Sequence, residues 1–423
     1  MLKKGMRMEN LLSDSDVEKI VVSGLESLAL EGKRVLAIVP DPTRTMPVSL
    51  FFRLITQYLK GRVKRIDFLV ALGTHPPLSE PALHKHFGIT PEERTDKYGD
   101  VGLYNHAWKD PQALTTLGKI PAKEMARLTE DRLAMDVEVQ LNRLILDYDH
   151  LLICGPVFPH EVVGFSGGNK YFFPGIAGPE IIDCTHWLGA LITCHTIIGR
   201  RDTAVRRVID RAAALIPRPR HAFCSVVTHA GMAGCYFGTP EEAFQEAVGL
   251  SAQVHIRRVE RPYQQVLSVL PEMYQEVWVG GKGMYKLEPV VADGGELILY
   301  APHIQEISLT HGKVIREIGY HVLDYYIKQW EKFKHYPWGV LGHSTQLRGI
   351  GEYNVETGIE RPRIQVTLAT GIPEEVCRSI NLGYRNPASI DPEAWERRKD
   401  PDVLVVQRAG EYLYRLATHE KQE

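Results

Sequence analysis

Residues 34–44, RVLAIVPDPTR, predict how the fold begins. The apolar run 34–40 is typical of a buried strand, and the polar DPTR after it marks a loop. Residues 48–60 follow with helical spacing of apolar side chains, and residues 65–75 form a second apolar run that ends in a polar loop. A strand, a helix and another strand in this order predict a βα unit with parallel strands.

The same alternation continues through the rest of the chain. Further strands are expected at 149–160, 221–228 and 362–370, and helices at 241–256 and 321–333. Residues 276–302 are expected to hold a helix, a Gly-Gly turn and a strand, and residues 402–416 a strand followed by a helix. We therefore predict an α/β fold with two α/β domains, 1–270 and 271–423, mostly parallel sheets, and an active-site cleft between the domains.

Composition excludes several classes of protein. The chain has 423 residues, and its 50 Lys and Arg nearly balance 52 Asp and Glu, so no basic surface for nucleic acid is expected. No apolar run reaches the roughly 18 residues that cross a bilayer, and the first residues lack the apolar core of a signal peptide. The six cysteines include no CxxC pair. Buried thiols in a reducing compartment are expected, which predicts a cytoplasmic protein without membrane partners.

The stretch GFSGGNK (164–170) is the first candidate for chemistry. Backbone N–H groups in a glycine-rich turn can hold a phosphate, although a tight structural turn explains the same residues equally well. The stretch is not a P-loop, because Tyr171 follows the lysine where Ser or Thr is needed. Lys170 lies between GGN and YFFPG, so we expect partial desolvation, a lowered pKa and a role as nucleophile or covalent anchor.

Three histidines are expected at loop positions near this turn: His75, His160 and His186. Each one alone is more often structural, but together they suit general acid/base chemistry or the binding of Zn, Cu, Fe or Ni. The chain has no HExxH motif and no cysteine cluster, so an all-protein zinc site is not predicted.

Charged residues at two further loops are also candidates. Asp41 and Thr43 could cap the next helix, with Pro47 at its start, whereas Arg44 could bind a carboxylate or phosphate. Lys282, in GGKGMYK, is either a solvated turn residue or a group that reaches across the cleft.

Six stretches, in the same order and at similar intervals, resemble the lactate racemase family, whose members use a nickel-pincer nucleotide. They are DPTR (41–44), GTHPPLSE (73–80), HEVVGFSGGNKYFFPGIAG (160–178), THWLG (185–189), KGM (282–284) and DGG (293–295). The resemblance implies a racemase or epimerase of 2-hydroxy acids that depends on separate cofactor-biosynthesis proteins. It makes residues 1–270 the cofactor-binding domain and residues 271–423 the domain that closes over the site.

The implied cofactor is pyridinium-3-thioamide-5-thiocarboxylic acid mononucleotide carrying nickel. By resemblance, Lys170 binds it covalently, His186 ligates the metal, and His75 and His160 are the acid/base pair. One histidine would take the hydroxyl proton as hydride leaves Cα for the cofactor, and return of the hydride to the other face of the 2-keto acid would invert the centre. The other implied cofactor contacts are Asp41, Thr43, Gly164, Ser166, Gly167 and Gly168, and the implied substrate contacts are Arg44, Lys282, Trp278 and Trp338.

One departure from the family pattern concerns the substrate. Trp278 and Val279 stand where the lactate enzyme has tyrosine and glutamine, while residues 338–348 are rich in hydroxyl, amide and imidazole groups. These changes predict a substrate longer than lactate, with an aldonate such as gluconate ahead of an aromatic acid such as phenyllactate. The alternative functions are a phosphate-binding transferase that uses the GFSGGNK turn, and a non-catalytic nucleotide- or metal-binding protein.

Overall fold

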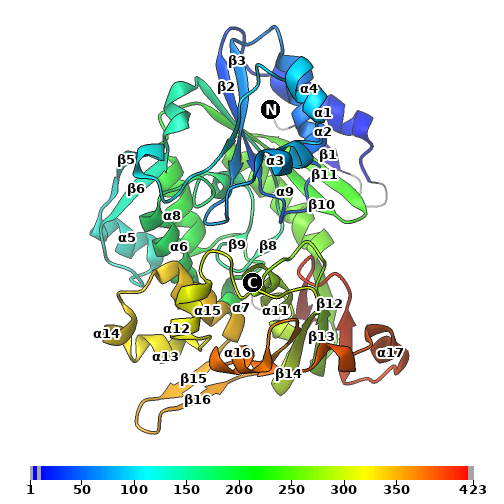
Figure 1. The fold of residues 1–423 in the computed structure, drawn as a ribbon. Helices are drawn as coiled ribbons and strands as arrows, with labels where there is room; N and C mark the ends of the chain where they lie inside the picture. Colours follow the sequence, from blue (N-terminus) through cyan, green and yellow to red (C-terminus); the bar gives the residue numbers. More distant parts are fainter. Residues whose placement is uncertain (1–2, 7–10, 418–423) are drawn as a thin grey trace. The chain divides into compact units, whose positions relative to one another are not determined.

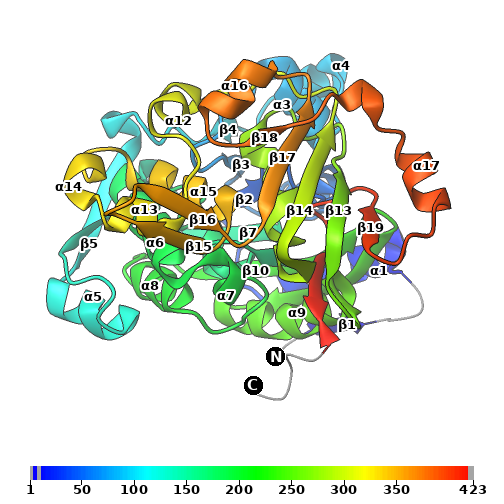
Figure 2. The ribbon, with the colours of Figure 1, turned by 90° about the horizontal axis from the view of Figure 1, so that it is seen from below.

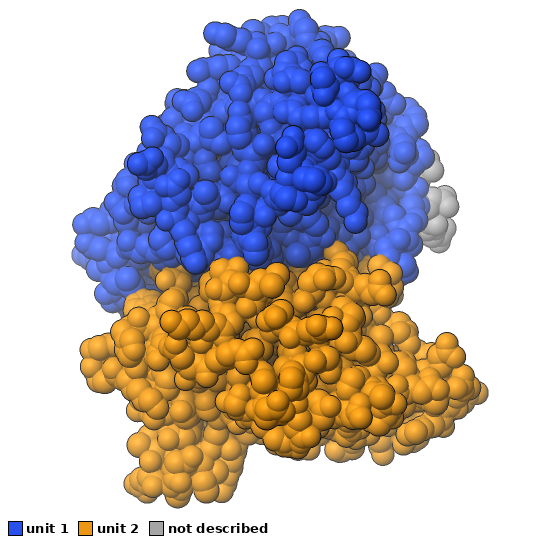
Figure 3. Space-filling model, in the orientation of Figure 1, with its two compact units in different colours: residues 1–158, 165–182, 206–254 blue, residues 159–164, 183–205, 255–423 orange. Residues whose placement is uncertain are grey.

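The computed structural model describes residues 3–6 and 11–417, which divide into two compact units (Figure 3). The first unit comprises residues 1–158, 165–182 and 206–254, and the second comprises 159–164, 183–205 and 255–423. The chain therefore passes between the units several times, and two short segments of its N-terminal half belong to the second unit. The functions expected for 1–270 and 271–423 stay predictions.

A seven-stranded sheet forms the centre of the first unit (Figure 1). Its order is β1 (Lys3–Met6), β11 (Gly231–Gly238), β10 (Arg220–Thr228), β7 (His150–Pro156), β2 (Arg34–Pro40), β3 (Arg65–Ala71) and β4 (Leu103–Asn105). The neighbouring strands from β10 to β4 pair in parallel. β11 is antiparallel to β10, and β1 is antiparallel to β11. Ile38 lies in register between Leu69 and Ile153, so the predicted βα beginning is confirmed.

Helices α1 (Asp14–Glu26) and α2 (Val48–Leu59) pack together with residues of this sheet in one apolar core. The start of α1 is fixed by a capping box, in which Ser13 accepts from the Asp16 amide and Asp16 accepts from the Ser13 amide. Phe52 of α2 is fully buried, and its ring lies 4.8–5.2 Å from the rings of Phe68, Phe87 and Tyr98. This aromatic cluster anchors α2 to the sheet.

The second unit is built on a five-stranded sheet in which every neighbouring pair is parallel (Figure 2). Its order is β18 (Gly383–Tyr384), β17 (Gln365–Thr370), β14 (Val291–Ala301), β13 (Tyr263–Val269) and β19 (Val403–Val406). Leu267, Ile298 and Ala369, one from each central strand, form an apolar core with Ile390 and Trp395. The α/β fold class with mostly parallel sheets is therefore confirmed in both units.

The remaining elements surround these sheets or connect their strands. In the first half of the chain they are α3 (Glu80–Phe87), α4 (Pro91–Asp96), β5 (Leu114–Ile120), α5 (Ala122–Thr129), β6 (Val137–Asn142), β8 (Pro159–His160), β9 (Gly164–Phe165), η3 (Gly168–Tyr171), α6 (Pro179–Ile192), α7 (Cys194–Ile197), α8 (Ala204–Ala213) and α9 (Pro240–His255). Later come β12 (Ile256–Val259), α10 (Val277–Gly280), α11 (Lys282–Tyr285), η4 (Glu288–Val290), α12 (Gly312–Ile318), α13 (Leu323–Ile327), α14 (Trp330–Phe333), α15 (Trp338–Arg348), β15 (Gly351–Asn354), β16 (Ile359–Pro362), α16 (Glu374–Ser379), α17 (Pro392–Arg397) and β20 (Leu413–Leu416). Short 3-10 turns lie at Pro111–Ala113, Arg143–Asp147 and Pro387–Ser389.

Three parts of the secondary-structure prediction were wrong. The end of 402–416 is strand β20 rather than a helix, because Leu413–Leu416 pair in parallel with β12. The helix expected at 321–333 is broken into α13 and α14, because Gln329 leaves the helical conformation with φ −123° and ψ 31°. Residues 338–348, for which we predicted no element, form helix α15.

Two expectations from composition can be compared with the structure. All six cysteines are buried, as expected. Across residues 3–6 and 11–417, none of the helices combines the length and the apolarity that crossing a membrane requires.

Replacing Phe52 with alanine should test the role of the aromatic cluster. We expect the free energy of unfolding of the first unit to fall by about 3–5 kcal/mol, because a buried ring is lost and a cavity remains. Phe52→Leu, which keeps most of the volume, should cost about 1 kcal/mol. Chemical denaturation followed by circular dichroism measures both, and equal losses for the two variants would contradict the assignment.

Candidate active site

The loop after β2 and the loop after β3 bring Asp41 and His75 together in the first unit. Both strands are parallel neighbours, so their carboxyl ends lie at the same edge of the sheet. Asp41 Oδ2 lies 3.3 Å from His75 Nδ1, and Asp41 Oδ1 accepts a 2.7 Å hydrogen bond from the Thr43 amide. The carboxylate therefore fixes the orientation of the His75 ring and leaves Nε2 as the atom for proton transfer.

The charge of Asp41 is stabilised despite its burial. Burial acts to raise the pKa of Asp41, but His75, Arg44 and Thr43 together hold the pKa well below its ordinary value. Asp41 and Thr43 do not cap α2, contrary to the structural role we considered, because the N-cap is Pro47 and receives no side-chain hydrogen bond. Arg44 lies over the Phe158 ring, with its guanidinium carbon 5.3 Å from the ring centre.

The glycine turn is packed tightly within the first unit. Gly167 and Gly168 have φ of 102° and 56°, in the region that favours glycine. A Cβ on Gly167 would collide with Val157, and one on Gly168 would lie 2.9 Å from the Pro240 carbonyl oxygen. Packing thus explains these two glycines, while a contact of the turn with a nucleotide stays a prediction.

Two polar residues hold this turn in place. Arg206 is buried and donates to the Gly167 carbonyl at 3.1 Å and to the Phe165 carbonyl at 2.6 Å. Its guanidinium carbon lies 4.0 Å from the centre of the Phe244 ring. Asn169 Nδ2 donates to Asp210 at 3.0 Å and to Glu241 at 2.7 Å. The sequence analysis did not identify Arg206 or Asn169, because their partners are distant in sequence.

Lys170 differs from its neighbours in exposure. Within residues 162–174 every residue except Lys170 is buried, including Ser166. Lys170 belongs to the 3-10 turn η3, whose other members pack inside the unit. The turn therefore holds one partly exposed lysine on a rigid, buried support, as a covalent anchor requires.

The second unit contains His160 and the glycine Gly164, which follows it in the short hairpin strand β9. His160 is buried, and its Nδ1 lies 3.2 Å from both the Val162 amide nitrogen and Glu161 Oε2. An unprotonated Nδ1 accepts from the amide, and a protonated Nδ1 donates to the carboxylate. Both contacts use Nδ1, so proton transfer at this ring would also use Nε2. Glu161 is a further residue that the sequence analysis did not identify.

His186 lies on α6, where helix α15 approaches closely. A Cβ on Gly342 would lie 2.9 Å from the His186 carbonyl oxygen, and the Gly339 amide donates to Asp183 at 2.8 Å. Burial raises the pKa of that aspartate. The W-G-x-x-G spacing at the start of α15 was a sequence signal for this close approach. Over the described ranges of the chain, no group of three or more His, Cys, Asp and Glu side chains has an arrangement that could hold a metal ion.

The tryptophans expected near the substrate lie in two different clusters. Trp338 packs with Trp187 and Trp330, at ring distances of 6.5 and 5.5 Å, and its indole N–H donates to the Lys334 carbonyl. Trp278 instead stacks on His343, with ring centres 3.6 Å apart and planes 7° from parallel. The substrate roles of both tryptophans stay predictions.

Lys282 begins helix α11 and is buried in the second unit. Its ammonium lies 4.9 Å from the centre of the Tyr274 ring, which favours a cation at that position. The lysine is thus a buried residue with a defined position rather than a solvated turn residue.

Comparison with known proteins places these residues in a family. Residues 14–196 match the model of the lactate racemase N-terminal domain. The lactate racemase of Thermoanaerobacterium thermosaccharolyticum is 25% identical over 191 residues, and that of Lactiplantibacillus plantarum is 27% identical over 169 residues. Residues 14–196 therefore form a lactate racemase N-terminal domain. The two alignments cover 44% and 38% of this chain, and they span 39% and 34% of the length of those relatives.

Two solved structures resemble the chain over nearly its whole length. A crystal structure of a Thermotoga maritima protein is 33% identical, covers 96% of this chain and 98% of its own, and has a TM-score of 0.88. The lactate racemase apoprotein of T. thermosaccharolyticum matches with a TM-score of 0.69 at 19% identity, over 94% of this chain and 92% of its own. The second match shows the shared fold.

Replacing Arg206 with methionine should loosen the glycine turn. The Gly167 and Phe165 carbonyls would lose their bonds from the guanidinium, although Gly167 would keep a 3.3 Å bond from the Lys170 amide. We therefore expect the free energy of unfolding to fall by about 2–4 kcal/mol. The matched control is Arg207→Met on the same helix, which removes a half-exposed ion pair with Glu130 and should cost about 1 kcal/mol or less. Urea titration measures both losses, and a loss for Arg206→Met no greater than that of the control would contradict this role.

Proposed function

We propose that this chain is a racemase or epimerase of 2-hydroxy acids that works with a nickel-pincer nucleotide bound covalently to Lys170. The observation that carries the proposal is the matched setting of His75 and His160. Each has a carboxylate oxygen close to Nδ1, at 3.3 Å from Asp41 and at 3.2 Å from Glu161. Inversion at one carbon needs two acid/base groups, and a carboxylate on Nδ1 is a usual way to orient such a histidine.

The donor set of the protein fits the proposed cofactor. His186 is a candidate metal ligand, and the described ranges contain no group of three or more His, Cys, Asp or Glu side chains that could hold a metal ion. One imidazole suffices where an organic cofactor provides the remaining donors, which the pincer nucleotide does through two sulfurs and a ring carbon. Lys170 supports the proposal independently, because it is the partly exposed residue of an otherwise buried turn.

The residues of the chain then have distinct roles in the reaction. The bound cofactor supplies a hydride acceptor. One histidine takes the hydroxyl proton of the substrate at Nε2, and the other returns a proton to the oxygen when the opposite stereoisomer forms. Arg44 and Lys282 are the cations that bind the substrate carboxylate. Asp41 orients His75, so we assign it this positioning role in addition to the cofactor contact that the family resemblance implies.

The setting of His343 supports a substrate longer than lactate. His343 Nε2 donates to the Trp278 carbonyl at 2.9 Å, while Nδ1 is buried and has no hydrogen-bond partner among the described residues. Burial lowers the pKa of His343 to about 4, so the ring is neutral near pH 7 and Nδ1 is an acceptor. We propose that a distal hydroxyl of an aldonate such as gluconate donates to this atom, which lactate cannot do.

Covalent attachment can be tested by replacing Lys170 with alanine. The protein should be produced in cells that make the cofactor, because it depends on separate biosynthetic proteins. We expect the wild-type intact mass to show an adduct that peptide mapping places on Lys170, and we expect Lys170→Ala to lose both the adduct and bound nickel. The exposed Lys123→Ala should retain both. An adduct that maps to another lysine would overturn the assignment.

Substrate preference can be tested with a panel of enantiopure 2-hydroxy acids read by chiral chromatography. We expect the highest kcat/KM for an aldonate, a lower value for phenyllactate and the lowest for lactate. His343→Phe keeps an aromatic stack on Trp278 but removes the acceptor, so it should lower kcat/KM for gluconate about 10-fold and leave lactate nearly unchanged. The substrate proposal fails if lactate turns over with the highest kcat/KM, while the reaction type would stand.

A further inference from the structure

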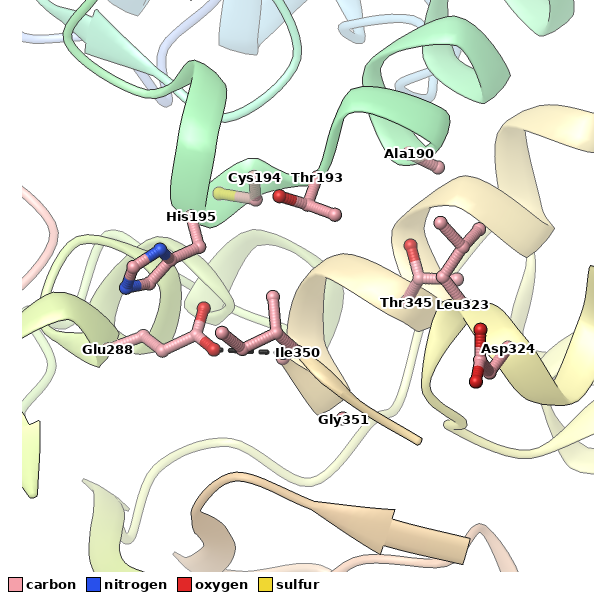
Figure 4. Close-up of a pocket in the computed structure, with 11 residues that line it drawn as sticks. Ala190, Thr193, Cys194, His195, Glu288, Leu323, Asp324, Thr345, Ile350 and Gly351 are labelled. Atoms are coloured by element: carbon pink, nitrogen blue, oxygen red, sulfur yellow. Dashed lines mark hydrogen bonds between the residues drawn. The ribbon is translucent and has the colours of Figure 1, made fainter. Parts of the chain in front are cut away.

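A pocket within the second unit is lined by none of the residues assigned above (Figure 4). Its volume is about 150 Å³, which is room for roughly five water molecules. Residues near the ends of α6 and α15 line it together with η4 and α13. The side chains that matter for the argument are Thr193, Glu288, Asp324 and Thr345.

Glu288 is the unusual member of the lining. It is fully buried, and its Oε1 accepts a 2.9 Å hydrogen bond from the Ile350 amide. Its Oε2 is also buried but has no hydrogen-bond partner among the described residues. Figure 4 shows this second oxygen turned to the side of the pocket where Cys194 and His195 lie. A buried acceptor without a partner is costly, so a partner inside the pocket would stabilise the fold.

The guanidinium of Arg363 lies near Glu288 but does not bind Oε2, and its buried Nε has no hydrogen-bond partner among the described residues. Arg363 donates through Nη2 to the Glu288 backbone carbonyl, and through Nη1 to the Val291 carbonyl and to Asp293 Oδ1. Burial raises the pKa of the Glu288 carboxyl, while the Ile350 amide and Arg363 act in the opposite sense. A cation in the pocket would therefore find a carboxyl oxygen that no described side chain already binds.

The surroundings of the pocket also favour positive charge. Asp324 supplies a second carboxylate at the far side, where it accepts from Lys328. Ala190 lies in the last turn of α6, and Thr345 in the last turn of α15, so both helices direct their negative dipole ends here. No metal-holding group of three His, Cys, Asp or Glu occurs in the described ranges, so the donors suit a monovalent ion rather than a transition metal.

Two hydroxyls complete the set of oxygen donors. Thr345 Oγ1 donates its proton to the Gly342 carbonyl, and Thr193 Oγ1 donates to Thr196 Oγ1. Thr193 Oγ1 also accepts a long bond from the Thr196 amide at 3.4 Å, so it keeps one lone pair, and Thr345 Oγ1 keeps its lone pairs because its proton is directed to Gly342. We propose that this pocket binds a monovalent cation of the size of K⁺ or NH₄⁺, with Glu288 as its principal ligand and the hydroxyls of Thr193 and Thr345 as further donors.

Thermal unfolding of the full chain without cofactor tests this proposal independently of catalysis. Tm is compared in choline chloride, KCl and NH₄Cl at equal ionic strength and at pH 8. We expect KCl or NH₄Cl to raise Tm by about 2 °C over choline chloride. The salt that gives the increment identifies the ion. Equal Tm values in all three salts would overturn the proposal, with water alone as the occupant of the pocket.

Variants assign the effect to the pocket. Glu288→Gln keeps an acceptor for the Ile350 amide but removes the charge, so the increment should disappear, whereas the exposed Glu356→Gln should retain it. Thr345→Val removes one oxygen donor and keeps Glu288, so it should reduce the increment in Tm. This variant replaces Glu288→Gln as the test if Glu288→Gln does not fold. An increment that is unchanged in Glu288→Gln, or in Thr345→Val where that variant is the one tested, would contradict the proposed ligands.

Discussion

The candidate site of the first unit depends on the hydrogen bonds that the buried guanidinium of Arg206 donates to the glycine turn. These hydrogen bonds to the carbonyls of Phe165 and Gly167 fix a turn whose glycines leave no room for side chains. Because the turn is fixed, Lys170 stays partly exposed while the residues around it are buried. A covalent cofactor needs such a support, because a flexible lysine would let the attached group move relative to the reacting carbon.

The same principle recurs at the two histidines. Each ring is held through Nδ1 by an acidic residue close in the fold, and in His160 that residue is the next one along the chain. The low pKa of Asp41 matters here, because a carboxylate that stays ionised keeps its partner imidazole in one orientation. Orientation by a neighbouring carboxylate leaves the other ring nitrogen to handle protons, which is the division of labour that acid/base histidines commonly use.

Local patterns in the sequence predicted much of the fold but little of the support around the site. Strand 34–40 was predicted with the bounds that the structure has, because a continuous apolar run between polar loops needs no distant partner to be recognised. Strand β20 was mistaken for a helix, since its pairing with β12 joins residues more than 150 positions apart. Arg206 and Asn169 were not identified for a similar reason. Glu161 and α15 were also missed, although the sequence contained a signal for each. Glu161 directly follows His160, and the glycine spacing of α15 indicates a close approach to another helix.

The central claim is that hydrogen leaves and returns to the same carbon of a 2-hydroxy acid as hydride. The most direct measurement is the isotope content at C2 after the cofactor-loaded enzyme has inverted one pure stereoisomer in D₂O. The account predicts that the inverted product retains protium at C2, because a hydride held in the site does not exchange with solvent. Full deuterium incorporation at C2 of the product would contradict it, since it would show that a base removes the hydrogen as a proton and solvent supplies its replacement.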